Sequence, residues 1–487
     1  MQRMSPQDAS FLHIEDDVNH MHIGSVVIFE GPPPAYDELC RHITGKLPLV
    51  PRYRQKVRFV PLELGRPVWV DDKHFNLGYH LRQTALGHPG GDEQLRTLVG
   101  RVMSQQLDRN KPLWEMWIVE GLEDDHWALI SKLHHSMVDG VSATDLLTVL
   151  MDSRPEPEPP VADDWQPEAE PSELRLVADA LVDRMVSPYE QIRGVQAALR
   201  APREAAELAT QTARGVMSLA GLARPTVGTS LSGPIGPHRR WGWARTSLAD
   251  VKLVRSALGG TVNDVILATI TGGFRELLLS RDEPVEGTVV RSLVPVSIRR
   301  PTERDTPNNR VSAMFAELPV GLADPVERLH SIHDQMKDLK DSKQAVAGEV
   351  LTSMAGFAPP MLLAMGTRLA MRVPQRNVNT VTTNVPGPQH VVYAVGRKML
   401  EAFPFVPLGG QVRIGVAIVS YNGRLNVGVT GDYDSAPDID VLCRGVEESM
   451  AELVKAAEGV TPKPTTPATK RSARSAARPA TTKTPGA

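Results

Sequence analysis

Residues 134–140, with the sequence His-His-Ser-Met-Val-Asp-Gly, restrict the folding of this chain more than any other segment. The apolar, partly alternating run before them, Trp127–Leu133, predicts a β-strand, and Val141–Leu150 after them has apolar residues at helical spacing. A strand that ends in two histidines, followed by an Asp-Gly turn and a helix, is a poor way to build core. It is well suited to holding one imidazole rigidly at a loop.

The two histidines should point to opposite faces of the strand, so they cannot easily bind one metal ion. No cluster of Cys, Asp or Glu stands nearby to complete a metal site. One ring is expected to face the packed side and the other an open cleft, where it is a candidate general base near neutral pH. Asp139 could orient His135 directly, or it could pair with an arginine and fix the loop, which is the role that we favour because the Asp points into the turn. His134 and Gly140, which permits a tight turn, complete the candidate site, and no metal is predicted.

The chain is long enough for two domains of ordinary size, at 487 residues. A net charge of −3 gives no global attraction to nucleic acid or anionic lipid. Cys40 and Cys443 lie far apart without CxxC spacing, which argues against a disulfide framework or zinc site and suits a reducing cytosol. No signal peptide and no uncharged apolar run of 18 or more residues is evident, so we expect a cytoplasmic protein, soluble or peripheral at a membrane.

Residues 1–152 form the first predicted unit, of mixed α/β structure. Its expected strands and helices are Ile23–Glu30, Met116–Val119, Asp37–Leu47 and Asp92–Leu107. Residues 153–240 follow as a connector, which begins with a Pro-rich, acidic surface linker and continues with Ala-rich helices. These helices are expected to pack across both domains, with an interaction arm as the alternative.

Residues 241–459 form the second predicted α/β unit. Its strand candidates are Thr288–Val296, Val381–Thr383, Val412–Ser420 and Leu425–Thr430. Residues 460–487 are rich in Thr, Pro, Ala, Lys and Arg, a composition that cannot bury a core and predicts disorder. This basic tail is either simply solvated or a weak tether to anionic lipid headgroups, at about 1 kcal/mol per basic residue near such a surface.

The motif at 134–140 resembles the signature of the acyltransferase superfamily that includes chloramphenicol acetyltransferase, peptide-synthetase condensation domains and plant alcohol acyltransferases. Further segments resemble the bacterial bifunctional wax ester synthase/diacylglycerol acyltransferase family, in the same order along the chain. They are residues 4–12, 21–24, 112–115, 261–268, 294–299, 308–312, 383–388 and 420–423. Each match is weak alone, but eight in order are a specific signal that leaves only the linker and the tail outside.

The resemblance implies an α/β fold of two chloramphenicol-acetyltransferase-like domains with a cleft or tunnel between them. It also implies that His135 is the general base, that acyl-CoA enters from one side and that an acceptor alcohol enters from the other. His135 would take the hydroxyl proton during attack on the thioester and pass it to the leaving thiolate, without a covalent acyl-enzyme. Acyl-CoA is then a substrate, and no cofactor is expected.

Five further residues enter the candidate site through the resemblance. Asn263 could donate a hydrogen bond at the oxyanion or align the cleft, whereas Asp264 is expected to cap the following helix, and an ordinary helix start would explain both residues. Trp114 is a candidate substrate-binding residue, although we favour a structural role in a wall near the acyl channel. Asn384 and Pro386, in a turn-forming run, are candidate substrate-binding residues on the acceptor side.

The predicted function is acyl transfer from acyl-CoA to diacylglycerol, which forms triacylglycerol. Wax ester synthesis on long-chain alcohols, transfer to another cell-envelope alcohol, and a non-catalytic lipid-binding protein with a retained site remain as alternatives. The absence of an adjoining carrier-protein module argues against peptide-synthetase condensation. A membrane or lipid-droplet surface is an expected place of contact, at the inner membrane or at lipid bodies, and nucleic acid is not an expected partner.

Overall fold

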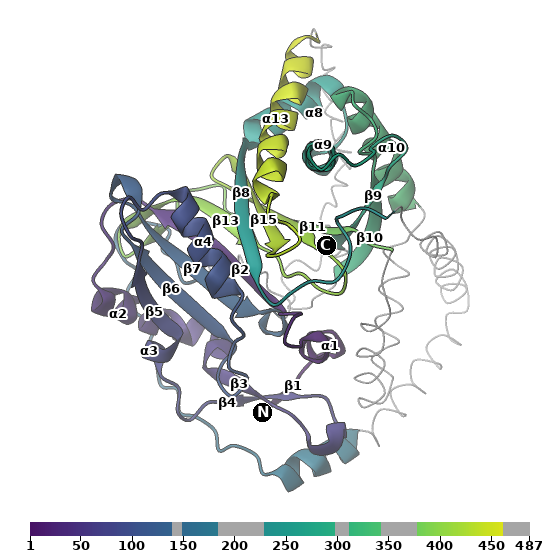
Figure 1. The fold of residues 1–487 in the computed structure, drawn as a ribbon. Coiled ribbons are helices and arrows are strands. Elements are labelled where there is room, and N and C mark those ends of the chain that lie inside the picture. Colours follow the sequence, from purple (N-terminus) through teal and green to yellow (C-terminus); the bar gives the residue numbers. More distant parts are fainter. Residues whose placement is uncertain (139–148, 184–227, 298–310, 342–376, 461–487) are drawn as a thin grey trace, which may run out of the picture.

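The computed structural model describes residues 1–138, 149–183, 228–297, 311–341 and 377–460 (Figure 1). Asp139, Gly140, the predicted helix at 141–150 apart from its last two residues, most of the predicted connecting helices and the tail at 461–487 lie outside these ranges. Within them the chain forms mixed α/β structure around two large sheets, in agreement with the predicted fold class.

The first large sheet carries the histidine motif at the end of a central strand. It has six strands, in the order β12 (Tyr393–Ala394), β13 (Arg397–Phe405), β2 (His22–Phe29), β7 (Trp127–His134), β6 (Trp114–Glu120) and β5 (Leu81–Ala85). Every residue of β7 is buried, because the strand has neighbours on both edges and packed layers on both faces. The predicted strands at 23–30, 116–119 and 127–133 are confirmed.

The second large sheet also has six strands. Their order is β10 (Val311–Leu318), β9 (Val290–Ser297), β11 (Thr380–Pro386), β14 (Ile414–Tyr421), β15 (Arg424–Asp432) and β8 (Arg239–Ser247). The four strand candidates of the second half each overlap one of these strands, although β9 and β14 begin two residues later than predicted. A smaller sheet of β1 (Gln2–Arg3), β4 (Val68–Asp71) and β3 (Gln55–Arg58) lies near the N-terminus.

Helices cover these sheets. They are α1 (Pro6–Ile14), α2 (Tyr36–Lys46), α3 (Leu77–His80), α4 (Asp92–Met103), α8 (Leu248–Leu258), α9 (Val262–Ser280), α10 (Pro325–Asp341) and α13 (Ile439–Glu458). Short 3₁₀ turns occur at Leu47–Leu49, Pro51–Arg54, Pro61–Glu63, Glu123–Asp125 and His135–Met137, the last labelled η5, and residues 173–183 are also helical. The helix predicted at 92–107 ends earlier, at Met103, because the Ser104 hydroxyl bonds to the Gly100 carbonyl at 2.7 Å and closes the last turn.

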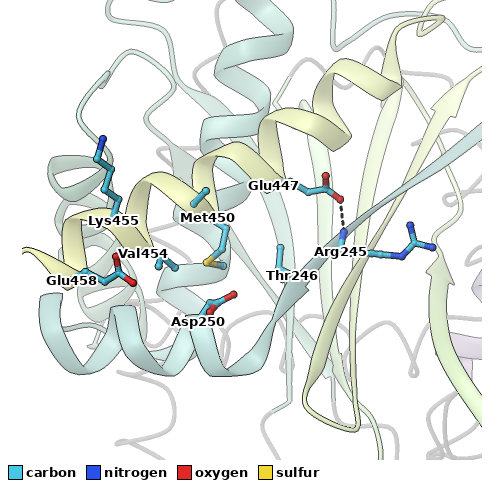
Figure 2. A pocket seen from close by; sticks show the side chains of 9 residues that line it. Arg245, Thr246, Asp250, Glu447, Met450, Val454, Lys455 and Glu458 are labelled. Atoms are coloured by element: carbon cyan, nitrogen blue, oxygen red, sulfur yellow. Dashed lines mark hydrogen bonds between the residues drawn. The ribbon is translucent and has the colours of Figure 1, made fainter.

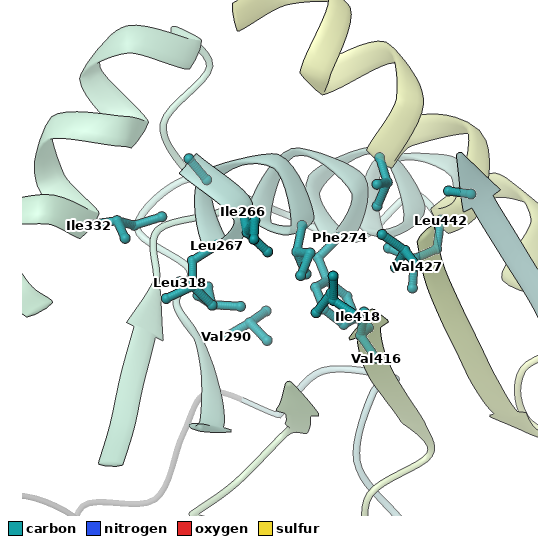
Figure 3. Packing of buried hydrophobic residues seen from close by; sticks show 14 of the residues in the cluster. Ile266, Leu267, Phe274, Val290, Leu318, Ile332, Val416, Ile418, Val427 and Leu442 are labelled. Carbon is teal, nitrogen blue, oxygen red and sulfur yellow. The ribbon is translucent and has the colours of Figure 1, made fainter. Parts of the chain in front are cut away.

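Helix α9 is the centre of the second half (Figure 3). Its residues from Asp264 to Phe274 are all buried, so the helix is buried around its whole circumference rather than along one stripe. It packs against α13, α10 and α8 and covers the β9, β14 and β15 side chains Val290, Ile418 and Val427. This core fixes the second sheet as a rigid platform.

Strand β13 crosses from the second half of the chain into the first sheet. It pairs antiparallel with β2, from Met399 opposite Phe29 to Phe405 opposite Gly24. The predicted division of the chain at residue 241 therefore does not coincide with the division between the sheets, since residues 393–405 complete the N-terminal sheet. The order of the strands along the sequence does not indicate that β13 joins the sheet of the first half.

No single helix in the described ranges is both long and apolar enough to cross a membrane. By length and composition alone, the pair α8 and α9 could do so together, with a bend of 103° between them.

Candidate active site

His134, the last residue of β7, is buried with only 1% of its surface exposed. Its Nδ1 accepts a hydrogen bond from the Ser136 amide at 3.1 Å and lies 2.7 Å from the Ser136 hydroxyl. The ring is thus the N-cap of η5, the turn that begins with His135. Because Nδ1 is an acceptor, the neutral ring carries its proton on Nε2.

His135 opens η5 and is half-buried, in contrast to its neighbour. Its ring stacks on Phe11 of α1, with centroids 3.9 Å apart and an angle of 22° between the planes. Its backbone amide donates to the Met21 carbonyl at 2.8 Å, which fastens the start of the turn to the chain leading into β2. Burial lowers the pKa of His135 to about 4, so its imidazole is uncharged at neutral pH.

The Glu15 carboxylate, just after α1, contacts one guanidinium group and two imidazole rings. Its Oε2 lies 2.7 Å from Nη2 of Arg109 and 3.4 Å from Nε2 of His134, and its Oε1 lies 3.3 Å from Nε2 of His22. Burial opposes ionisation of this carboxyl, but the hydrogen bonds with His134 and His22 outweigh it and hold the pKa of Glu15 far below its ordinary range. Burial lowers the pKa of His22 to about 3, which keeps that ring neutral.

Phe11, Glu15, Arg109 and Ser136 were not predicted as site residues. Phe11 and Glu15 are one helical turn apart, and the Glu15 amide donates to the Phe11 carbonyl at 3.2 Å. Phe11 lies in the segment 4–12 that resembles the family opening, whereas Glu15 lies just beyond it and Arg109 reaches Glu15 across the fold.

Asp264 does not join the histidine cluster. Its carboxylate accepts from the Thr261 amide at 2.8 Å, while its own amide donates to the Thr261 hydroxyl, so it forms the predicted cap of α9. The same Oδ2 lies 2.8 Å from Nδ1 of His333 on α10, a link that the sequence did not predict. Asn263 is half-buried beside it at the start of α9, and its role at an oxyanion stays a prediction.

Trp114 is completely buried at the start of β6, one strand from the motif. Its indole N–H donates to the Tyr53 carbonyl at 2.8 Å, and its ring stacks on His80 with centroids 4.5 Å apart. The indole N–H and the ring face of Trp114 therefore both have partners within the protein. The geometry favours the structural role over substrate contact.

Asn384 and Pro386, both exposed, lie on β11. Asn384 is opposite Ile418 in the middle of β14, and Pro386 is opposite Ser420 near its end, where the neighbouring Tyr421 donates its hydroxyl proton to the Met399 carbonyl at 3.0 Å. Met399 is opposite the last residue of β2, whereas the His135 amide bonds to the chain before β2 begins. Pro386 therefore lies toward the other end of the strands from His135, and the role of both residues in binding the acceptor stays a prediction.

The two cysteines are free thiols that the histidine cluster does not include. Burial raises the pKa of Cys443 to about 12 and also raises that of half-buried Cys40. Both therefore remain protonated at neutral pH, which does not suit a nucleophile. Within the described part of the chain, no group of three His, Cys, Asp or Glu side chains is placed to hold a metal ion.

A hollow of about 310 Å³ lies elsewhere, between β8, α8 and α13 (Figure 2). Its lining includes Thr246, Asp250, Met450, Lys455 and Glu458. It shares no residue with the histidine cluster, and its mixture of opposite charges offers no base beside an apolar channel. We therefore place the candidate active site at η5.

Two family profiles match the chain. The wax ester synthase/diacylglycerol acyltransferase catalytic domain matches residues 4–266, and the C-terminal domain of the same family matches residues 308–454. A Mycobacterium tuberculosis protein named as a probable diacylglycerol O-acyltransferase (tgs1) is 37% identical over 457 residues, which cover 93% of this chain and 96% of the relative. Another protein of that organism, named as a putative diacylglycerol O-acyltransferase, is 31% identical over 93% of this chain and 91% of its own length.

Solved structures agree with the two-domain fold. The wax ester synthase/diacylglycerol acyltransferase from Marinobacter aquaeolei VT8 is 25% identical, covers 94% of this chain and 100% of its own, and superimposes with a TM-score of 0.66. The trichothecene 15-O-acetyltransferase TRI3 from Fusarium sporotrichioides, at 11% identity, covers 93% of this chain and 94% of its own with a TM-score of 0.58, which shows the fold alone. The predicted two-domain α/β acyltransferase fold is confirmed by these similarities.

Proposed function

The chain belongs to the wax ester synthase/diacylglycerol acyltransferase family, and we propose that it is an acyl-CoA-dependent diacylglycerol O-acyltransferase in which His135 is the general base. The acyltransferase class follows from the family. The choice of diacylglycerol as acceptor is supported by the names of the relatives that share more than 30% of their residues with this chain.

The observation that carries the assignment of the base is the environment of His135 at η5. The Nδ1 atom of His135 is buried without a hydrogen-bond partner among the described residues, and we assign Nε2 as the nitrogen that meets the substrate. The stacked Phe11 ring fixes the plane of the imidazole. A neutral imidazole in a fixed plane is the state that can accept a proton.

The reaction needs no covalent intermediate on the protein. The acceptor oxygen attacks the thioester carbonyl as Nε2 of His135 takes the hydroxyl proton, so a C–O bond forms. When the tetrahedral intermediate collapses, the C–S bond breaks and the proton passes from Nε2 to the CoA sulfur. Proton transfer of this kind contributes roughly 10²–10⁴-fold to the rate, in addition to the gain from holding both substrates together.

We also propose that the protein meets its acceptor at a lipid surface, either the inner membrane or a lipid body. Diacylglycerol is too apolar to be delivered from water, since each buried CH₂ group contributes about 0.8 kcal/mol. Flotation of the protein with vesicles that contain diacylglycerol tests this part independently of catalysis.

The decisive experiment measures CoA release from palmitoyl-CoA with diacylglycerol or hexadecanol as acceptor, for the wild type and for His135→Ala. We expect acceptor-dependent release that the substitution abolishes, with a higher rate on diacylglycerol. A higher rate on hexadecanol would favour wax ester synthesis, the second activity in the family name. No turnover with either alcohol would favour another acceptor or a lipid-binding role, and full activity of His135→Ala would exclude this residue as the base.

A further inference from the structure

Helix α1 lies against η5 and reaches the histidine motif at two points one turn apart. Phe11 touches His135 directly by stacking, and Glu15 touches His134 through an ion-pair contact of 3.4 Å. The segment 11–15 therefore contacts the base and the residue before it at the same time.

The Glu15 carboxylate is itself held from several sides. Arg109 binds its Oε2 through both Nη2, at 2.7 Å, and Nε, at 3.1 Å, while the Met21 amide donates to its Oε1 at 3.4 Å. The Glu15 side chain is only 4% exposed, whereas that of Arg109 is 38% exposed. A buried carboxylate with a two-point guanidinium partner has one preferred orientation, so its contact with His134 is directional.

The contact with Glu15 lies on the side of the His134 ring opposite to its hydrogen bond with η5. Nδ1 of His134 accepts from the Ser136 amide, so its proton is on Nε2, which faces Oε2 of Glu15. One ring nitrogen is thus hydrogen-bonded to the turn that carries the base, and the other lies within ion-pair distance of the carboxylate. Any rotation of His134 would release the N-cap of η5 and with it the position of His135.

We propose that Glu15 is a positioning residue for the base, acting through His134, with Arg109 as its anchor. This inference rests on the proposed function, because Glu15 can position the base only if His135 is that base. Glu15 touches no reacting atom. Its contribution is to keep the imidazole of His135 within reach of the acceptor hydroxyl.

The test compares Glu15→Gln, His134→Asn and the double variant in the acyl transfer assay. Asparagine retains an acceptor at the place of Nδ1 and is a good N-cap, but it has no atom that reaches Glu15. We expect each single variant to lower kcat by on the order of 10- to 100-fold, with KM for acyl-CoA changed by less than about twofold. The double variant should be no slower than the slower single one, because both substitutions break the same link.

Asp152→Asn is the matched control. The Asp152 side chain is also completely buried, with Lys46 at 3.0 Å and His42 at 3.7 Å, and it has no hydrogen bond or ion pair with residues 134–138, the described part of the motif. This variant should lower the melting temperature but leave kcat unchanged. An equal loss of kcat in the control would overturn the inference, because the effect would then follow from the loss of any buried carboxylate.

If Glu15→Gln does not fold, Arg109→Gln tests the same inference. The Arg109 side chain is partly exposed, so its replacement should disturb folding less. We expect a smaller fall in kcat at unchanged KM. Wild-type kcat in a folded Glu15→Gln or Arg109→Gln protein would contradict the inference, as would losses that multiply in the double variant. If instead His135→Ala were fully active, the proposed function itself would fail, whatever Glu15 does.

Discussion

Replacing Phe11 with alanine should shift the acid limb of kcat/KM to higher pH. The phenyl ring covers one face of the His135 imidazole, with ring centroids 3.9 Å apart, and is part of the burial that lowers the pKa of His135 from 6.5 to about 4. That shift corresponds to about 3 kcal/mol in favour of the neutral ring. Alanine would let water reach this face and stabilise the charged form, so the pKa should rise.

The expected size of the effect follows from the fraction of neutral base. At pH 5.5 a histidine with its ordinary pKa is about 9% neutral, whereas one with a pKa near that of His135 is about 97% neutral. Wild-type kcat/KM should therefore change by less than about twofold between pH 8 and pH 5.5, where an unperturbed base would lose about tenfold. If Phe11→Ala removes half of the shift, its kcat/KM at pH 5 should fall roughly two- to threefold relative to the wild type.

Labelled palmitoyl-CoA and diacylglycerol would be used across pH 5 to 8.5 at constant ionic strength, with triacylglycerol separated and counted. This readout avoids thiol-reactive dyes, whose response fails in acid, and circular dichroism at each pH confirms that the protein is folded. Phe59→Ala is the control, because this ring is 40% exposed and follows β3 of the smaller sheet, whereas the motif is at the end of β7 in a large sheet. A wild-type acid limb near pH 6.5, or identical limbs in wild type and Phe11→Ala, would refute the reasoning.

Three further outcomes can be checked by urea unfolding. Trp114→Phe should lower the free energy of unfolding by about 1–3 kcal/mol, because the Tyr53 carbonyl loses its buried donor. Its acyl-chain preference in the transfer assay should match the wild type, and an altered preference would indicate that Trp114 contacts the substrate. Asp264→Ala should cost about 1–2 kcal/mol through loss of the α9 cap and the link to His333, and an unchanged midpoint would contradict that role. The free energy of unfolding should fall as the pH drops below 6.5, because His22 has a folded pKa of about 3 and is protonated in the unfolded state at a higher pH than in the folded state. An unfolding free energy that does not change between pH 7 and 4.5 would count against the burial of His22 as a neutral ring.

The histidine strand was predictable because its signal is local. The run from Trp127 to Leu133 is apolar except for Ser131 and Lys132, and the structure extends that strand by one residue to His134. The cap formed by Asp264 was likewise predictable, because a Thr followed three residues later by an acidic residue is the local pattern of a capping box.

The anchoring of the motif was not predictable because its parts come from distant positions. Glu15 and Arg109 each look like ordinary surface charges in the sequence, and only the fold brings them to His134. The same reason hides β13, whose residues Arg397–Phe405 mix charged and aromatic side chains and pair with a strand near the other end of the chain. Asn384 was assigned to the site by motif order, which does not indicate how far its strand lies from the base, and its role stays a prediction.

The pairing of β13 with β2 has a consequence for how this protein is made. At a synthesis rate of about 5–20 residues per second, tens of seconds separate the emergence of β2 from that of its partner. During that interval the Val-Val-Ile-Phe segment of β2 has an open edge that other unfinished chains could pair with. We therefore expect the nascent first half to depend on chaperones at the ribosome. Slower translation should lengthen the time for which this edge of β2 is unpaired.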